Sequence, residues 1–213
     1  VNAVMGLEVG TARAKRLADE LGLARVLFVN MLDRERADFY RTLAQIQDQF
    51  SSRCVAVHLP IGAEQGLSGI VDVLHMCAYA TPDGGREGDH LPIPDEMREI
   101  AQAYREKLLD EVVQTDETLM EQYLAGEELD VHDVAAALKE AVTRGEVFPV
   151  ACGVATKNLG THALLDLIVE GVPSPARKGA PMEIDGASTA AFVFKTLADP
   201  FAGRINLFRV LKG

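Results

Sequence analysis

The chain has 213 residues, and with 48% hydrophobic and 25% charged residues its composition is that of a folded globular protein rather than a disordered one. Its 32 acidic and 21 basic residues give a net charge of −11, which argues against a protein that binds the phosphate backbone of DNA or RNA irrespective of sequence. No apolar run approaches the roughly 20 residues of a membrane span, the three cysteines form no C-x-x-C pair, and no histidines stand at metal-ligand spacing. We therefore expect a cytoplasmic protein with no membrane partner and no metal site.

The first fifty residues predict a β–α–β unit. The opening "VNAVMG" is typical of the end of a buried strand, residues 11–21 place apolar side chains on one helical face, and Gly22 is expected to end that helix. Residues 24–30, "ARVLFVN", form a continuous apolar run of the kind that buried parallel strands show. A second helix is expected from about Ala37 to Phe50.

The middle of the chain predicts two strand regions followed by acidic helices. Residues 54–64 are interpreted as a strand that Pro60 and Gly62 interrupt, residues 67–80 as one further strand, and residues 81–95 as a surface loop rich in Gly and Pro. Three helices are expected after this loop: one from Pro94–Glu96 to about Val112, one from Asp116 to about Ala125, and one that Asp130 caps and Gly145 ends.

This helical segment is strongly acidic, with 12 acidic and three basic residues from Glu106 to Glu146. Charge alone favours a solvated helical face over a docking surface for a basic partner, and it leaves both interpretations open.

The last part of the chain predicts a strand, a helix and a pair of strands. Residues 146–155 are interpreted as a buried strand, and the helix that follows has Thr161 available as its N-terminal cap. "PSPARKGAP" is a Pro-rich linker, and beyond it residues 190–197 and 204–211 alternate as two antiparallel strands.

Two loops in this scheme carry the candidate chemistry. In a parallel sheet the loops after the carboxyl ends of the strands converge, which brings Asn30 and Asp33 close to "CGVATKN", residues 152–158. A carboxylate accepts hydrogen bonds from both the N1–H and the exocyclic amino group of guanine, which adenine cannot donate together, and an asparagine can hold the loop and reach N7. By itself N-x-x-D after a strand is weak evidence, because turns use Asn and Asp constantly.

A longer match supports the nucleotide interpretation. "FVNMLDRERADFYRTLAQI", "LPIGAE", "GIVDVL", "FPVACGVATKNLGTHALLDLIVEGVPSP" and "TLADPFAGRINLFRVLKG" resemble segments of translation elongation factor G in the same order. The resemblance implies an α/β fold: the C-terminal half of a P-loop GTPase domain, with a parallel sheet and helices, an inserted α+β subdomain and the first strands of a β-barrel. The implied boundaries are 1–50 and 147–176 for the GTPase domain, 51–146 for the G prime insertion, 177–186 for a linker and 187–213 for the barrel.

The resemblance also implies a guanine site and its ligands. It assigns GTP or GDP to Asn30, Met31, Asp33, Val154, Ala155 and Thr156. The family pattern has Lys where this chain has Met31 and Ser where it has Val154, so we expect weakened binding, as in divergent elongation-factor-G-like paralogues. Neither G-x-x-x-x-G-K-[ST] nor a switch-type D-x-x-G motif occurs, so we assign no catalytic residue, expect no hydrolysis by this chain alone and assign Mg²⁺ only to a full-length protein. Both ends of the chain look cut, and we expect a fragment.

The implied partner is the ribosome, including its stalk protein, which the acidic insertion would contact through Glu121, Glu127 and Glu128. Two alternatives remain open at this stage. One is a fragment of a ribosomal protection or release-factor GTPase, and the other is a non-catalytic interaction module with an acidic docking face.

Overall fold

The computed structural model describes residues 1–80, 90–174 and 189–212, with the side chains of Ala80 and Lys212 excepted. These residues form two compact units, Val1–Pro173 and Ser174–Gly213. The predicted linker at 177–186 and most of the predicted loop at 81–95 lie outside the described residues. The fold is mixed α/β, as the sequence predicted.

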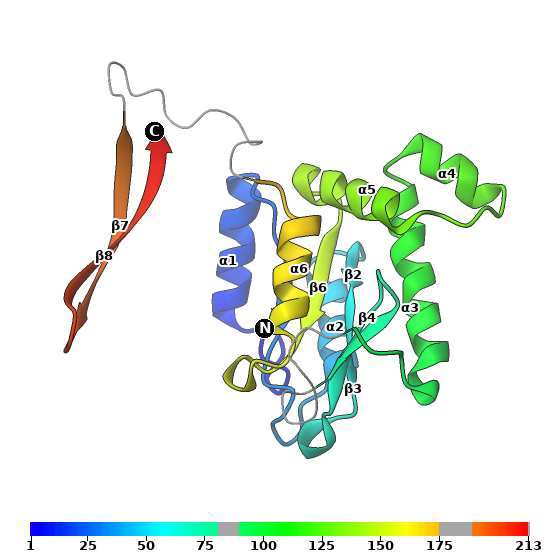
Figure 1. The fold of residues 1–213 in the computed structure, drawn as a ribbon, viewed down its shortest axis with the longest axis horizontal. Coiled ribbons are helices and arrows are strands. Elements are labelled where there is room, and N and C mark those ends of the chain that lie inside the picture. Colours follow the sequence, from blue (N-terminus) through cyan, green and yellow to red (C-terminus); the bar gives the residue numbers. More distant parts are fainter. Residues whose placement is uncertain (81–89, 175–188, 213) are drawn as a thin grey trace. The chain divides into compact units, whose positions relative to one another are not determined.

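A parallel sheet stands at the centre of the first unit (Figure 1). Strand β6 (Phe148–Cys152) pairs in parallel with β1 (Leu27–Val29) on one side and with β2 (Cys54–Ala56) on the other. Residues 1–3 run along β1: the Val1 amino group donates to the Phe28 carbonyl oxygen, and the Asn30 N–H donates to the Val1 carbonyl. The apolar runs therefore form parallel strands, mostly buried in β2 and β6 and partly buried in β1, which confirms the predicted sheet.

Two helices of the N-terminal half agree with the predicted β–α–β pattern. Helix α1 (Val9–Glu20) ends before Gly22, which has the positive φ of +57° that a helix terminus needs. Helix α2 (Phe39–Gln49) begins at Asp38, whose carboxylate accepts a hydrogen bond from the Arg41 N–H. Helix α1 contains no fully buried residue, whereas α2 buries its apolar face against the sheet.

The second strand region differs from its prediction. The chain leaves the parallel sheet at Val57, not at Pro60: the Val57 N–H donates to Val150 of β6, and its carbonyl accepts from the Val73 N–H. Strand β3 (His58–Ile61) therefore follows β2 directly and belongs to an antiparallel sheet with β4 (Gly69–Asp72) and β5 (Cys77–Ala80). Pro60 is tolerated inside β3 because β3 is an edge strand of that sheet.

Residues 67–80 form two strands rather than the single strand predicted. The cause is Asp72, whose carboxylate accepts hydrogen bonds from the N–H groups of Leu74 and His75 at 2.8 and 3.0 Å and so closes a turn. Met76 completes the reversal with a φ of +53°. An Asp within an apolar run was the available signal for this turn.

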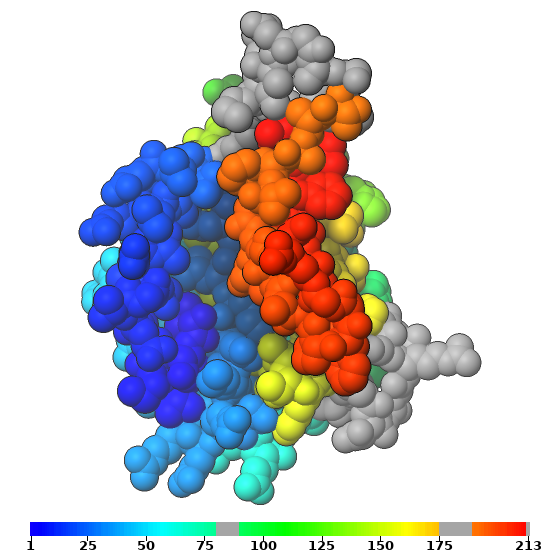
Figure 2. Space-filling model, turned by 90° about the vertical axis from the view of Figure 1, so that its left-hand side faces the viewer, coloured from blue at the N-terminus to red at the C-terminus, as the bar shows by residue number. Residues whose placement is uncertain are grey.

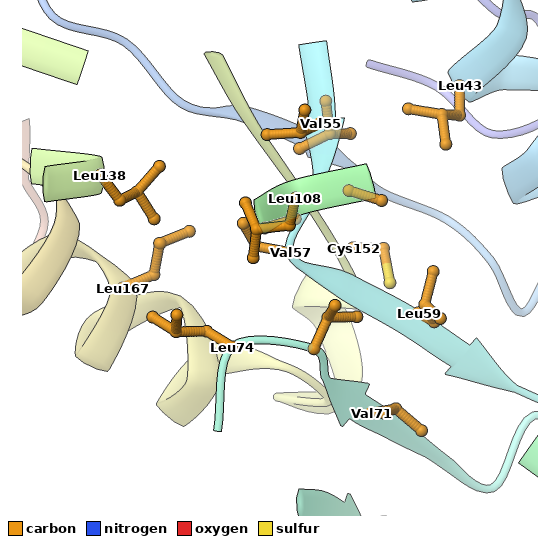
Figure 3. Close-up of a cluster of buried hydrophobic side chains, with 14 of the residues drawn as sticks. Leu43, Val55, Val57, Leu59, Val71, Leu74, Leu108, Leu138, Cys152 and Leu167 are labelled. Carbon is orange, nitrogen blue, oxygen red and sulfur yellow. The ribbon is translucent and has the colours of Figure 1, made fainter. Parts of the chain in front are cut away.

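The three acidic helices form where the sequence predicted them, and α3 and α4 lie on the side of this unit far from α1 (Figure 1). They are α3 (Asp95–Val113), α4 (Glu117–Leu124) and α5 (Val131–Arg144). Asp116 and Asp130 cap the last two through their carboxylates, and Gly145 ends α5 in the left-handed conformation. Figure 3 shows Leu138 of α5 and Leu167 of α6 (Thr161–Gly171) facing Leu108 of α3 and Val57. The acidic helices thus share one apolar core with the sheet.

Helix α6 begins differently from its prediction. Gly160, not Thr161, is the N-terminal cap residue; it has a φ of +81° and supplies no side-chain cap. Thr161 is the first residue of the helix.

The second unit is an antiparallel hairpin of β7 (Ala190–Asp199) and β8 (Gly203–Lys212), as predicted. Its side chains are largely exposed (Figure 2). Val193 pairs with Phe208 on one face, and Leu197 pairs with Ile205 on the other, so apolar groups lie on both faces. A two-stranded hairpin with two apolar faces is marginal by itself, which suits strands from the start of a barrel.

Candidate guanine-binding site

The two strand-end loops that the sequence singled out converge at one edge of the parallel sheet. Asn30 follows β1, and its side-chain Oδ1 accepts from the Ala155 N–H at 3.0 Å and from the Met31 N–H at 2.8 Å. Ala155 follows β6, and 125 positions separate it from Asn30. One amide side chain therefore ties the base loop, residues 30–38, to the loop of residues 153–160.

The loop of residues 153–160 is fixed by its own backbone. The Gly153 N–H donates to the Val29 carbonyl oxygen, and Val154 pairs with Leu159 through hydrogen bonds in both directions. Between them Ala155–Lys157 form one turn of 3-10 helix, which Asn158 ends with a φ of +54°. A Cβ on Gly153 would lie 2.3 Å from the Leu159 oxygen, so glycine is required for this close approach.

Asp33 of the base loop contacts the loop of residues 153–160. Its carboxylate Oδ2 is 3.2 Å from the Lys157 ammonium nitrogen, and its side chain is 15% exposed whereas that of Lys157 is 63% exposed. The carboxylate is therefore anchored from the loop of residues 153–160 and still reaches the surface. Lys157 makes this contact, and Asn158 ends the turn that carries Lys157.

The other residues predicted to contact the base differ in how far their side chains are exposed. Met31 is 42% exposed and has a φ of +67°, while Ala155 and Thr156 are exposed in the 3-10 turn. Val154 is buried, with 1% exposure, so its side chain belongs to the core, and only its backbone could support a ligand. Contact between any of these residues and guanine remains a prediction.

Glu64 also belongs to this region, although it was not among the residues predicted for the site. The Glu64 N–H donates to the Leu32 carbonyl, and its carboxylate Oε1 accepts from the Arg36 N–H at 2.7 Å. The available signal was the quoted segment "LPIGAE", which ends on this residue.

Unusual backbone conformations gather in the same region. Of the five non-glycine residues with positive φ in the described part of the chain, four lie in these loops or support them: Met31, Arg36, Glu64 and Asn158. Each such conformation costs on the order of 1 kcal/mol or more, and such costs are common at functional sites.

The hydrogen-bonding groups of Asp33 and Asn30 are complementary to those of a guanine base. A carboxylate offers about four lone-pair sites, so Asp33 can keep its contact with Lys157 and still accept from two N–H groups of a guanine edge. The Asn30 amide nitrogen has no hydrogen-bond partner among the described residues and is available as a donor. This sequence has no phosphate-loop motif that would bind the phosphates and Mg²⁺, so base recognition is the chemistry that this arrangement could perform.

The predicted partner residues lie apart from this site. Glu121 is on α4, and Glu127 and Glu128 are in the segment after it; all three are exposed. Leu124, at the end of α4, is 77% exposed beside them.

A second group of ionisable side chains joins the antiparallel sheet to α6. Asp72 Oδ2 is 2.9 Å from His75 Nδ1, and Glu170 Oε2 of α6 is 3.1 Å from His75 Nε2. The hydrogen bond to Asp72 raises the pKa of His75. Burial acts to raise the pKa of Asp72, but its hydrogen bond with His75 and the neighbouring His58 hold it below the usual value. We interpret this group as a structural link.

The described residues offer neither a membrane-spanning helix nor a metal cluster. No helix within 1–80, 90–174 or 189–212 is long and apolar enough to cross a membrane. Over the same ranges, no three His, Cys, Asp or Glu side chains are grouped so that they could hold a metal ion.

Comparison with known proteins identifies the family. Residues 1–174 match the family model described as the elongation factor Tu GTP binding domain. The structure also matches a crystal structure of a protein from Thermus thermophilus with a TM-score of 0.80 and 36% sequence identity. That match covers 100% of this chain and 31% of the other, so this chain spans less than a third of the protein that it resembles. Because the family model matches most of its length, the chain belongs to the family of the elongation factor Tu GTP binding domain.

Proposed function

We propose that this chain supplies the guanine-recognition part of a ribosome-associated translational GTPase of the elongation factor G type. The observation that carries the proposal is the hydrogen bond of Asn30 Oδ1 to the Ala155 N–H, which holds the base loop and the loop of residues 153–160 together beside the Asp33 carboxylate. GTP or GDP is the ligand, bound weakly by this chain through its base. Hydrolysis and Mg²⁺ belong to the activity of a longer protein.

The recognition step follows from hydrogen-bond chemistry. Asp33 accepts from guanine N1–H and from the exocyclic amino group, and Asn30 donates to N7. Met31 can supply an apolar surface beside the base, without the ammonium of the lysine that the family pattern has there.

Replacing Asp33 with asparagine should change the base preference of the site from guanine to xanthine. Xanthine carries a carbonyl where guanine carries its amino group, and an amide can accept from N1–H and donate to that carbonyl. We expect the unmodified chain to favour GDP over xanthosine diphosphate by about 10- to 100-fold and Asp33→Asn to reverse this order, because hydrogen bonds to charged groups are worth about 1.5–3 kcal/mol. NMR titration at millimolar nucleotide measures both affinities.

The control for this exchange is Asp48→Asn, which removes an exposed carboxylate of α2 outside the site. It should leave the preference for GDP unchanged. Equal binding of GDP, xanthosine diphosphate and ADP by the unmodified chain would reject the guanine site.

The acidic helices contribute the second part of the proposal, contact with the ribosomal stalk protein. Three exposed glutamates and the 77% exposed Leu124 gather at one end of α4, so acidic and apolar groups are available to one partner. A fragment of a ribosomal protection or release-factor GTPase, or an interaction module without nucleotide, would use the same surface.

Charge reversal tests the acidic surface. Changing Glu121, Glu127 and Glu128 to lysine should weaken capture of the stalk protein at least tenfold, because several close charge pairs are lost together. The matched control reverses three exposed acids outside the insertion, Glu8, Glu20 and Asp48. Equal loss in both variants would mean that net charge, rather than this surface, controls capture.

A further inference from the structure

The contact between Lys157 and Asp33 has a geometry that stability alone does not explain. The Lys157 side chain is 63% exposed, and exposed ion pairs contribute at most about 1 kcal/mol. Yet the backbone on both sides of the pair is held in uncommon conformations, at Met31 in one loop and at Asn158 in the other. The arrangement favours orientation of the carboxylate over stabilisation of the fold.

Lys157 is held in place by the loop that carries it. Its N–H donates to the Val154 carbonyl at 3.0 Å, and Asn158, with its φ of +54°, ends the 3-10 turn immediately after it. Because the Val154–Leu159 pairing fixes both ends of this turn, the lysine side chain starts from a defined position next to Asp33.

No other polar side chain of the described residues holds the Asp33 carboxylate. Its one ion pair there is with Lys157, and Val154 of the same loop is apolar and buried. A carboxylate without such a contact would rotate about its side-chain torsions and lose entropy on binding a base.

We propose that Lys157 is a positioning residue that orients Asp33 for bidentate recognition of a guanine edge. The inference rests on the proposed function and deepens it. The ammonium occupies one lone-pair site of Oδ2, which leaves acceptor sites on both carboxylate oxygens for the two guanine donors. In this chain the loop of residues 153–160 thus sets the selectivity of Asp33.

The readout is the preference for GDP over inosine diphosphate, because hypoxanthine lacks the exocyclic amino group. Both nucleotides carry the same phosphates, so the ratio of their affinities cancels any general attraction of the lysine for the diphosphate. Lys157→Met should lower this ratio roughly two- to fivefold, as expected when an exposed charge-assisted contact is removed. Lys157→Arg, which keeps a cation that can pair with the carboxylate, should restore most of it.

Two further readouts separate positioning from a structural effect. Arg13→Met removes an exposed cation from α1, outside both loops of the site, and should leave the ratio unchanged. The carboxyl ¹³C resonance of Asp33 should shift on addition of GDP in the unmodified chain and in Lys157→Arg, and much less in Lys157→Met. Amide spectra that match the unmodified chain confirm that each variant is folded.

The outcomes distinguish this inference from the function on which it rests. If the unmodified chain prefers GDP and Lys157→Met keeps the same ratio, the role of Lys157 is rejected while the guanine site stands. If the unmodified chain prefers GDP over neither inosine diphosphate nor ADP, the guanine site itself is rejected.

Discussion

Leu138→Ala should lower the free energy of unfolding of the first unit by about 2–5 kcal/mol. Leu138 has 0% exposure, and it lies between α3, α6 and the start of the antiparallel sheet (Figure 3). Truncation removes buried methyl groups and leaves a cavity that two helices and a sheet cannot easily collapse to fill. Urea denaturation followed by circular dichroism measures the change.

Leu124→Ala is the matched control for this truncation. The chemistry is identical, but Leu124 is 77% exposed at the end of α4, so its loss should change stability by no more than about 0.5 kcal/mol. Comparable losses in the two variants would mean that the acidic helices are not packed against the sheet as described.

Gly160→Ala is expected to destabilise the first unit by about 2–4 kcal/mol and to disturb the candidate site. At a φ of +81° any side chain is strained, and a Cβ would lie 2.6 Å from the Cys152 carbonyl oxygen and 2.7 Å from Ile70 Cδ1. Because Gly160 closes the loop of residues 153–160, relief of these contacts must move that loop. Thermal or urea unfolding gives the stability, and the amide resonances of Val154 and Ala155 report the displacement.

Gly22→Ala separates the strain of a positive φ from the effect of close contacts around the added Cβ. Gly22 also has a positive φ, +57°, but a Cβ there would meet nothing within 4 Å. It should therefore cost only the conformational part, about 1–2 kcal/mol. If Gly160→Ala cost no more than Gly22→Ala, the close packing against Cys152 would be wrong.

Much of the fold could be predicted from the pattern of apolar residues and from a few residues that begin or end helices. The apolar run before Asn30 predicts a buried strand, and Asp130 with Gly145 delimits α5 because a carboxylate and a left-handed glycine satisfy the ends of a helix. The convergence of the base loop with the loop of residues 153–160 could also be predicted, because parallel strands end at the same edge.

Most differences between the predicted and the observed elements arise where a residue acts through a partner far away in the sequence. Pro60 looks like a strand break, but an edge strand can accept it, and only the pairing of β3 shows that β3 is an edge. Val57 changes sheets because Val150 and Val73 offer it hydrogen bonds, which no local pattern reveals. Asp72, by contrast, acts locally, and a carboxylate within an apolar run could have indicated its turn.

The candidate site likewise combines features that the sequence predicts with contacts that only the folded structure reveals. The position of Asn30 and Asp33 beside residues 152–158 could be predicted because parallel strands end at one edge of the sheet, whereas their assignment to guanine depended on the family resemblance and stays a prediction. Lys157 could be placed near them, but its contact with Asp33 depends on the left-handed Asn158 and on the pairing of Val154 with Leu159.

The hydrogen bond between Asn30 and Ala155 also has a consequence for the order in which the chain folds. The two residues are 125 positions apart, so nearly the whole first unit must leave the ribosome during synthesis before the tie can form. Closing so long a loop is entropically costly and slow, unless the intervening helices fold first and shorten the effective distance. The acidic helices share the core of the sheet, so their packing would act as a scaffold for this closure. The candidate guanine-binding site is thus expected to be among the last parts of the unit to become ordered.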